Sequence, residues 1–222
     1  ILTENSTFRK DDLFESISVG ILDYALFLFS TSDLHKKHRK LIQPAFAPSH
    51  LRQVPRATVN TLQELVPILN SKLDSNNSVN LLIDELMMDV TLDILGIIAF
   101  GKSFSAVSSI GSDRSNNVWL HLDEVTLNPI SLRPIIPSFL WYFFGISSSS
   151  PAIKKSQNQM HAFFSELAAQ SEKKLKSYRE SDDQRFQLNV VERLLISHQD
   201  GLLTEKEIFG EVFGFNMITI TY

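Results

Sequence analysis

Residues 33–46 read DLHKKHRKLIQPAF, and the interpretation of the whole chain starts from this stretch. Ser32 or Asp33 can cap the start of a helix, because a short side-chain oxygen accepts a free backbone N–H of the first turn. Pro44 cannot continue a helix without the loss of a backbone hydrogen bond. We therefore expect a short helix that begins at the serine–aspartate pair and ends near the proline.

This helix is expected to present two different faces. Leu34, Leu41 and Ile42 offer one side to a hydrophobic core, whereas His35 and Arg39 are four residues apart and share another face. An imidazole beside a guanidinium can bind an anion, and the planar guanidinium matches a carboxylate with two parallel hydrogen bonds. The alternative is a solvated basic face without a ligand, since most surface charges are simply hydrated. Spacing alone leaves both interpretations open.

The composition excludes several classes of protein. The chain has 222 residues, of which 43% are hydrophobic and 21% charged, an ordinary balance for one large domain or a piece of one. The formal net charge of −4 argues against a nucleic-acid binder, because phosphate contacts need a basic surface. The sequence contains no cysteine, so it offers no disulfide, no thiolate metal ligand and no thiol nucleophile.

Residues 80–101, NLLIDELMMDVTLDILGIIAFG, are apolar on more than one helical stripe, which predicts a helix in the middle of a domain. Asp84, Asp89 and Asp93 interrupt the apolar run. These charges, the asparagine-rich loop before the run and Gly101 after it argue against a membrane span. Exposure to solvent explains the three carboxylates most simply, and a catalytic cluster of three carboxylates is the alternative.

Two longer helical patterns lie on either side of this segment. Residues 49–74 have apolar residues at helical spacing, but Pro55 and Pro67 predict a kink or an earlier boundary. Residues 151–180 keep a single apolar face, which is typical of a helix that packs on a core. A coiled-coil partner helix is the alternative for this second segment.

A capping box marks the start of the last helix. Thr204 and Glu207 are three residues apart, so that each side chain can satisfy a free backbone donor near the other. The helix that they begin is expected to run through Ile208, Val212 and Phe215 to the end of the sequence.

Residues 129–146, PISLRPIIPSFLWYFFGI, form the most apolar stretch outside the expected helices. Three prolines exclude a straight spanning helix, and the run is too short to cross a bilayer. The aromatic residues at 141–144 belong to the types that favour interfaces. The stretch is therefore either a loop packed in the core or a segment that contacts a membrane surface.

Three segments resemble the cytochrome P450 family, in the order in which that family carries them. Residues 35–46, with His35, Arg39 and the Pro-Ala-Phe ending, resemble its C helix. Residues 93–101, in which Asp-Ile leads to Ala-Phe-Gly, resemble the end of its E helix, and residues 200–212, DGLLTEKEIFGEV, resemble the start of its I helix. The resemblance implies a mainly α fold: part of the cytochrome P450 fold, from helices B and C to the start of helix I.

The resemblance also implies that residues 1–222 are the amino-terminal part of a single cytochrome P450 domain. The family's membrane anchor and its carboxy-terminal half, with the cysteine that ligates the haem iron, would then be absent from the chain. On this interpretation the chain supplies no metal ligand, and the fragment alone is expected to be inactive.

The resemblance assigns roles to a few residues. In the family, the arginine of the C helix and the residue four before it hydrogen-bond the haem propionates, which implies that Arg39 and His35 bind haem b here. The family's I helix carries a small residue, an acid and a threonine that handle the protonation of dioxygen. Counting along the final ITITY makes Thr219 or Thr221 the candidate threonine, although this segment has neither the glycine nor the acid. Phe215 would line the substrate pocket.

The implied reaction is the insertion of one atom of dioxygen into a small apolar organic substrate. Electrons would come from an NADPH-dependent reductase or another donor, and no nucleic acid is expected as a partner. The parent protein would be membrane-associated, in the endoplasmic reticulum, with residues 130–146 at the membrane surface.

Two alternatives of another class remain. A non-catalytic helical protein could bind lipid or a protein partner through residues 139–144, and it would fold alone and bind liposomes without haem. A truncated relic would have no activity, and its missing core partners would leave apolar surface exposed.

Overall fold

A computed structural model describes residue 26 and residues 33–111, 131–180 and 188–220 of the chain. Every regular element in these ranges is a helix, so the prediction of a mainly α fold is confirmed. Within the same ranges, no helix has both the length and the apolar character that crossing a membrane requires.

The sequence 33–46 forms a helix, as expected. Helix α2 spans Asp33–Ile42 and is followed by the 3-10 helix η1, Gln43–Phe46, and the one-turn helix α3, Pro48–Leu51. Pro44 lies in the first turn of η1, where a missing N–H costs no helical hydrogen bond. The buried side chains of α2 are those of His38 and Ile42, so a histidine that was expected to be part of a basic run belongs to the interior.

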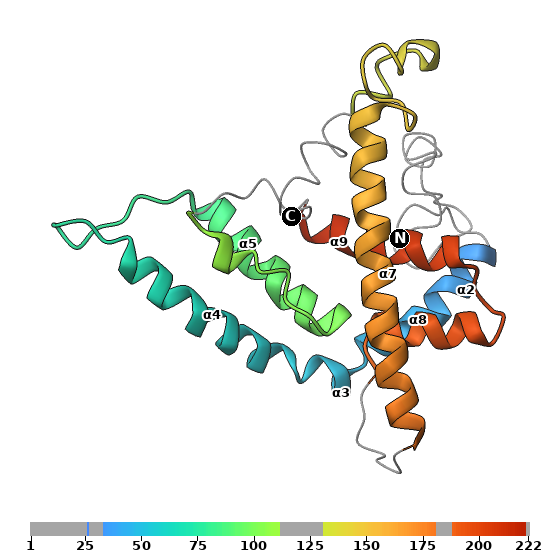
Figure 1. Cartoon of the computed structure of the whole chain (residues 1–222), viewed down its shortest axis with the longest axis horizontal. Helices are drawn as coiled ribbons and strands as arrows, with labels where there is room; N and C mark the ends of the chain where they lie inside the picture. Colours follow the sequence, from blue (N-terminus) through green and yellow to red (C-terminus); the bar gives the residue numbers. More distant parts are fainter. Residues whose placement is uncertain (1–25, 27–32, 112–130, 181–187, 221–222) are drawn as a thin grey trace, which may run out of the picture.

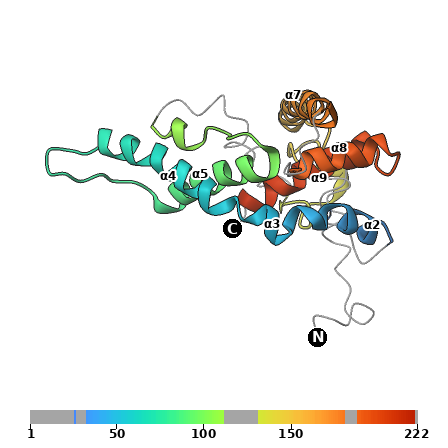
Figure 2. The same cartoon turned by 90° about the horizontal axis from the view of Figure 1, so that it is seen from below.

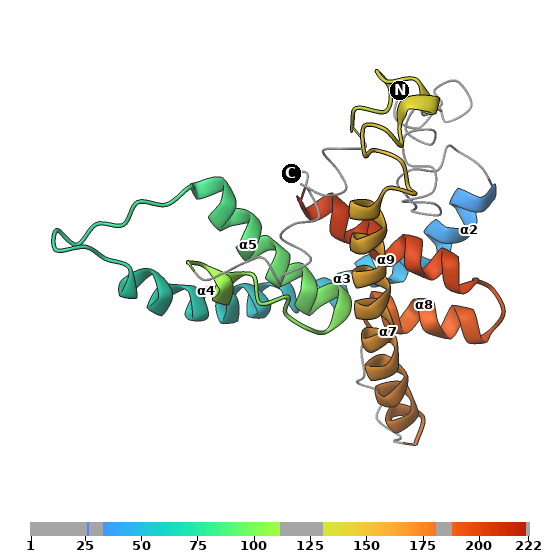
Figure 3. The ribbon, with the colours of Figure 1, turned by 45° about the horizontal axis from the view of Figure 1, so that its top comes forward.

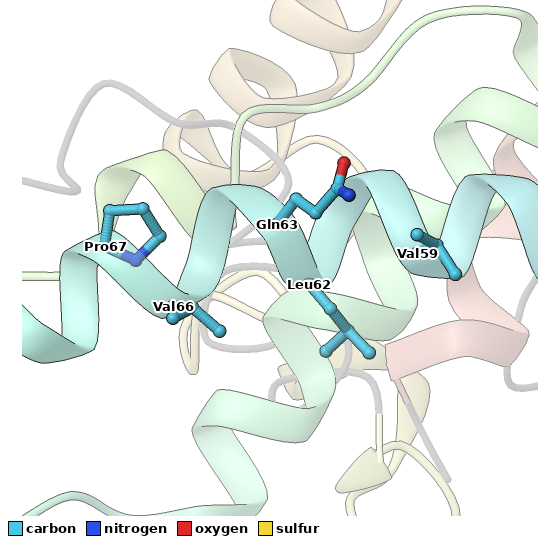
Figure 4. Close-up of a pocket in the computed structure, with 5 residues that line it drawn as sticks. All are labelled: Val59, Leu62, Gln63, Val66 and Pro67. Carbon is cyan, nitrogen blue, oxygen red and sulfur yellow. The ribbon is translucent and has the colours of Figure 1, made fainter.

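Helices α4, Val54–Ser71, and α5, Ile83–Leu95, lie side by side and extend away from the other helices (Figures 1 and 3). Their contact is a small core of Leu65, Leu86 and Val90, joined by Val107 of the 3-10 helix η3, Val107–Ser109. On its exposed side α4 has an open hollow of about 380 Å³ (Figure 4), which is lined by Val59, Leu62, Gln63, Val66 and Pro67.

The sequence predicted a kink or an earlier boundary at the two prolines of this segment, and a boundary is found at Pro55 but not at Pro67. Pro55 lies in the first turn of α4 and sets its start, because the missing N–H would have no helical acceptor there. Pro67, however, lies inside the helix, which continues to Ser71. Only the last turn follows Pro67, so the loss of one hydrogen bond near the end does not stop the helix.

Helix α5 ends in a short π-helix, η2, which spans Gly96–Phe100. A side chain at Gly96 would put its Cβ 2.6 Å from the carbonyl oxygen of Lys102, so only glycine allows this close return of the chain. The buried His50 donates from Nε2 to the carbonyl oxygen of Ile98 at 3.1 Å and so satisfies an acceptor that the widened turn exposes.

The main core lies where α2 and α5 meet three later helices: α7, Pro151–Glu180; α8, Val190–Gln199; and α9, Glu205–Ile220. Figure 2 shows α8 between α7 and α2, while α9 also packs against α5. The largest buried side chains of this core include those of Leu92, Ile153, Met160, Leu194, Ile208 and Phe213. Residues 151–180 thus pack within their own chain, as expected for a single apolar face.

Both α8 and α9 begin with a capping box. The predicted box of α9 is confirmed: the N–H of Thr204 donates to Glu207 Oε2 at 2.7 Å, and the N–H of Glu207 donates to Thr204 Oγ1 at 3.3 Å. Asn189 and Glu192 form the equivalent pair at α8. These caps fix where α8 and α9 begin.

Candidate functional site

The exposed side of α2 carries the pair that the sequence analysis singled out. His35 is half-buried and Arg39 is exposed. Of the other basic residues on this helix, Lys36 pairs with Asp33 at 3.1 Å and Lys37 pairs with Glu207 at 3.1 Å. In the part of the chain that the structure describes, no carboxylate lies within ion-pair distance of Arg39. The guanidinium is therefore accessible to an external anion.

The buried side of α2 carries a cluster that the sequence analysis missed. The imidazole of His38 is 0% exposed and lies between two carboxylates of α9: Nδ1 is 2.5 Å from Glu211 Oε1, and Nε2 is 3.1 Å from Glu207 Oε1. Lys37 Nζ reaches the same oxygen of Glu207. We call Lys37, His38, Glu207 and Glu211 the His38 cluster.

Burial and charge pairing act against each other in the His38 cluster. Burial disfavours the imidazolium, but hydrogen bonds to Glu211 and Glu207 outweigh it and raise the pKa of His38 above its usual 6.5. Burial also raises the pKa of Glu211 above its usual 4.5, and the bond from His38 only partly opposes this. For Glu207, burial is outweighed by donors from Thr204, His38 and Lys37, which lower the pKa to about 2.

The sequence contained weak signals for this cluster. Glu207 was recognised only as the glutamate of a capping box, and His38 only as one residue of a basic run. The two lie 169 positions apart in the chain, so no local pattern joins them. Glutamates at 207 and 211 share one face of α9, and this spacing was the one available hint of a common partner.

The three aspartates of residues 80–101 are not exposed as a group, so that expectation is wrong. Asp84 is exposed in the first turn of α5, but Asp89 and Asp93 are buried. Asp93 accepts from the hydroxyl of Ser103 at 2.7 Å and from the N–H groups of Ala106 and Val107 at 3.1 and 2.9 Å. Its carboxylate thus fixes residues 103–107 beside α5 by hydrogen bonds, which is a structural role. The structure does not gather the three carboxylates into one cluster, because one of them lies at the exposed helix end.

Two further candidates lie on α9, where the structure describes the backbone but not these side chains. Phe215 and Thr219 are within the helix, near its carboxy-terminal end. Thr221 lies outside the described residues. Within the described ranges, no group of three histidine, cysteine or acidic residues is arranged to hold a metal ion.

Residues 131–146, the described part of the aromatic stretch, form a tip at one end of α7 (Figure 3). Arg133 holds it from inside: Nε donates to the carbonyl oxygen of Ile146 at 2.8 Å, and the guanidinium lies 4.6 Å from the ring centre of Trp141. Outside, Phe139 and Phe143 are 81% and 83% exposed. The tip therefore combines a fixed interior with an exposed aromatic surface, and a loop packed wholly in the core is excluded.

Comparisons with known proteins all point to one family. The sequence model of the family described as "Cytochrome P450" matches residues 2–217. The chain is 25% identical over 229 aligned positions to "Probable cytochrome P450 4e1" of Drosophila melanogaster, a match that covers 97% of this chain and 40% of that protein.

Two fungal proteins match over shorter stretches. "Cytochrome P450 monooxygenase 128" of Postia placenta is 25% identical over 118 residues, 53% of this chain and 21% of that protein. "Cytochrome P450 monooxygenase buaD" of Petromyces alliaceus is 29% identical over 109 residues, 48% of this chain and 20% of that protein. The chain thus spans well under half the length of the relatives that it matches.

Proposed function

The chain belongs to the cytochrome P450 family, and from that premise we propose that residues 1–222 are the amino-terminal part of a single haem-thiolate monooxygenase domain. The whole protein would insert one atom of dioxygen into a small apolar organic substrate, with electrons from an NADPH-dependent reductase or another donor. Haem b, with a cysteine thiolate on its iron, would supply the oxygen chemistry. The match over residues 2–217 is the observation that carries this proposal.

The residues of α2 fit the acidic edge of a haem. Arg39 has an exposed guanidinium with no described carboxylate beside it, and His35 lies four residues before it on the same helix. A guanidinium binds a propionate with charge-assisted hydrogen bonds, and an imidazole N–H can add another. We assign both residues to the propionates, where they would bind and orient the cofactor.

The iron ligand is a part of the site that these residues cannot provide. The 222 residues include no cysteine, so the proposal places the thiolate in another part of the domain. The roles of Phe215 as a pocket wall and of Thr219 or Thr221 as the oxygen-side threonine are part of the same proposal. The continuous helix α9, which begins at the capping box and runs to Ile220, supports them.

The proposed function is tested by a comparison of two proteins. The 222-residue chain and the protein encoded by the complete source transcript are each purified, mixed with hemin and examined by absorbance spectroscopy in the reduced, carbon monoxide-bound state. We expect a thiolate-type spectrum from the complete protein and none from the 222 residues alone. A thiolate-type spectrum from the 222 residues, or its absence from the complete protein, would contradict the proposal.

The aromatic tip supports a membrane surface as a partner, and we propose that this membrane is the endoplasmic reticulum. Exposed phenylalanine and tyrosine side chains on a fixed loop gain free energy when they enter the lipid interface. We expect Phe139→Ser with Phe143→Ser to weaken binding to phosphatidylcholine vesicles by at least tenfold, measured by co-sedimentation. Val59→Ser with Val66→Ser, two exposed apolar residues of α4, is the matched control. Equal binding by both double variants would exclude the tip as the membrane contact.

Vesicle binding and haem uptake together distinguish the non-catalytic alternative from the monooxygenase. The exposed aromatic surface of the tip also suits a helical protein that only binds lipid or a protein partner. Such a protein would bind vesicles through the tip but would take up no haem even as the product of the complete transcript. A truncated relic would do neither.

A further inference from the structure

The His38 cluster is not explained by the proposed roles of Arg39 and His35. Both ring nitrogens of His38 face carboxylate oxygens, Nδ1 toward Glu211 and Nε2 toward Glu207. A neutral imidazole has only one N–H, whereas the imidazolium has two, so only the charged ring can donate to both ionised carboxylates. The geometry therefore favours a charged ring wherever both carboxylates are ionised, although a histidine in water would lose that proton near neutral pH.

The charged groups that contact this ring or its carboxylates come from α2 and α9. Lys37 on α2 contacts Glu207, and the backbone N–H of Leu26 donates to Glu211 Oε2 at 3.2 Å. Helix α8 also packs against α2, and its charged and titratable residues have other partners. Glu192 pairs with Lys174 at 2.7 Å, Arg193 donates to the Leu188 carbonyl, and the ring of His198 bonds the Leu203 carbonyl. The His38 cluster thus joins the buried ring of His38 and the exposed ammonium of Lys37 to two buried carboxylates.

This cluster is the polar connection between α2 and α9. The backbone of α2 packs mainly against α8 and only weakly against α9. Glu207 also closes the capping box of α9 through its other oxygen, Oε2. A single glutamate therefore fixes the start of α9 and binds the histidine of α2, so that the two helices are positioned together.

We propose that His38 is a positioning residue: its imidazole, held by Glu207 and Glu211 of α9, fixes α2 so that His35 and Arg39 are presented together to a haem propionate. The part that concerns haem rests on the proposed function, whereas the attachment of α2 to α9 does not. His38 itself would touch neither cofactor nor substrate, because it is fully buried behind the face that carries Arg39.

The attachment should depend on pH in a defined direction. The pKa of His38 is raised, so its contribution is complete below about 6.5 and is lost as the pH rises through the folded-state value. The raised pKa of Glu211 acts in the same direction, since the folded protein holds that proton more tightly above pH 4.5. The lowered pKa of Glu207 makes its contribution vanish only in acid, near pH 2. The cluster therefore weakens as the pH rises above 6.5.

Amide hydrogen exchange of the 222-residue chain tests the attachment without haem. We expect the protection factors of residues 33–42, corrected for intrinsic exchange, to fall by about tenfold or more between pH 6 and pH 9, while those of α5 stay level. His38→Gln should lower α2 protection at pH 6 by about tenfold to a hundredfold and remove its pH dependence. The control Lys40→Gln replaces an exposed cation on the same helix, α2, and should behave as wild type.

The pH dependence of α2 protection in the wild-type chain tests the attachment even if His38→Gln does not fold. Protection of α2 that is level from pH 6 to pH 9 in the wild-type chain, or unchanged in a folded His38→Gln variant, overturns the attachment. A hemin titration of the complete protein at pH 6 and pH 9 then tests the haem part. His38→Gln should weaken binding at pH 6 but not at pH 9. If the 222-residue chain shows the exchange result but the complete protein binds no hemin, the proposed function is overturned and the attachment is not.

Discussion

Replacing Arg39 by alanine is expected to weaken haem binding by about tenfold to a hundredfold, because the propionate loses its charged partner. Hydrogen bonds to charged groups contribute roughly 1.5–3 kcal/mol, and about 1.4 kcal/mol corresponds to a tenfold change in affinity. Arg39 is exposed, and no described carboxylate competes for it. The measurement is a hemin titration of the complete protein, followed by absorbance and by haem retained after gel filtration.

Lys40 provides the matched control for this prediction. It is the next residue on α2, it is also exposed, and Lys40→Ala removes the same charge. We expect Lys40→Ala to change hemin affinity less than threefold, since a screened surface charge contributes little. Arg39→Lys should lie between the two, because an ammonium keeps the charge but lacks the planar fork. Equal affinities of Arg39→Ala and Lys40→Ala would remove Arg39 from the propionate site.

The sequence predicted those parts of the fold that depend on local signals. The helix at residues 33–42, the long helix 151–180 and the capping box at Thr204 each follow from residues within a few positions of one another. Such signals act through backbone hydrogen bonds within one or two turns, so they can be read without knowledge of the tertiary structure. The family resemblance was carried by the same short segments.

The His38 cluster could not be predicted in this way. Its members come from α2 and α9, which are separated by 169 to 173 positions, and each residue has an ordinary local explanation. A histidine between lysine and arginine is expected to be exposed, because charged neighbours favour water. The structure buries it because two carboxylates of another helix compensate its charge, and that compensation is a property of packing.

The burial of Asp89 and Asp93 could not be predicted from local sequence patterns either. A carboxylate inside an apolar helical pattern is expected to face solvent, because burial without partners is costly. Asp93 is nevertheless 1% exposed, since the chain returns after η2 and brings a hydroxyl and two backbone N–H groups to it. These donors belong to residues 103–107, where no sequence pattern shows that they need an acceptor.

Asp93→Ala is accordingly expected to destabilise the chain more than the other substitutions proposed for it. We expect a loss of roughly 3–5 kcal/mol in the free energy of unfolding. Each buried donor that loses its acceptor costs about 1–3 kcal/mol, and some of this is recovered if water enters. The measurement is urea-induced unfolding of the 222-residue chain, followed by far-ultraviolet circular dichroism. Asp93→Asn should also destabilise, because its amide group places a donor against the donors of the loop.

The control Asp84→Ala separates the hydrogen bonds of Asp93 from the effect of a charge on α5. Asp84 is an exposed aspartate of the same helix, in its first turn. Its removal should cost less than about 1 kcal/mol, the favourable interaction of an acid with the helix dipole. If Asp93→Ala cost no more than Asp84→Ala, the three donors would not need the carboxylate. The loss of its bonds should also open residues 103–107 to hydrogen exchange first, because Asp93 is the acceptor that fixes them beside α5.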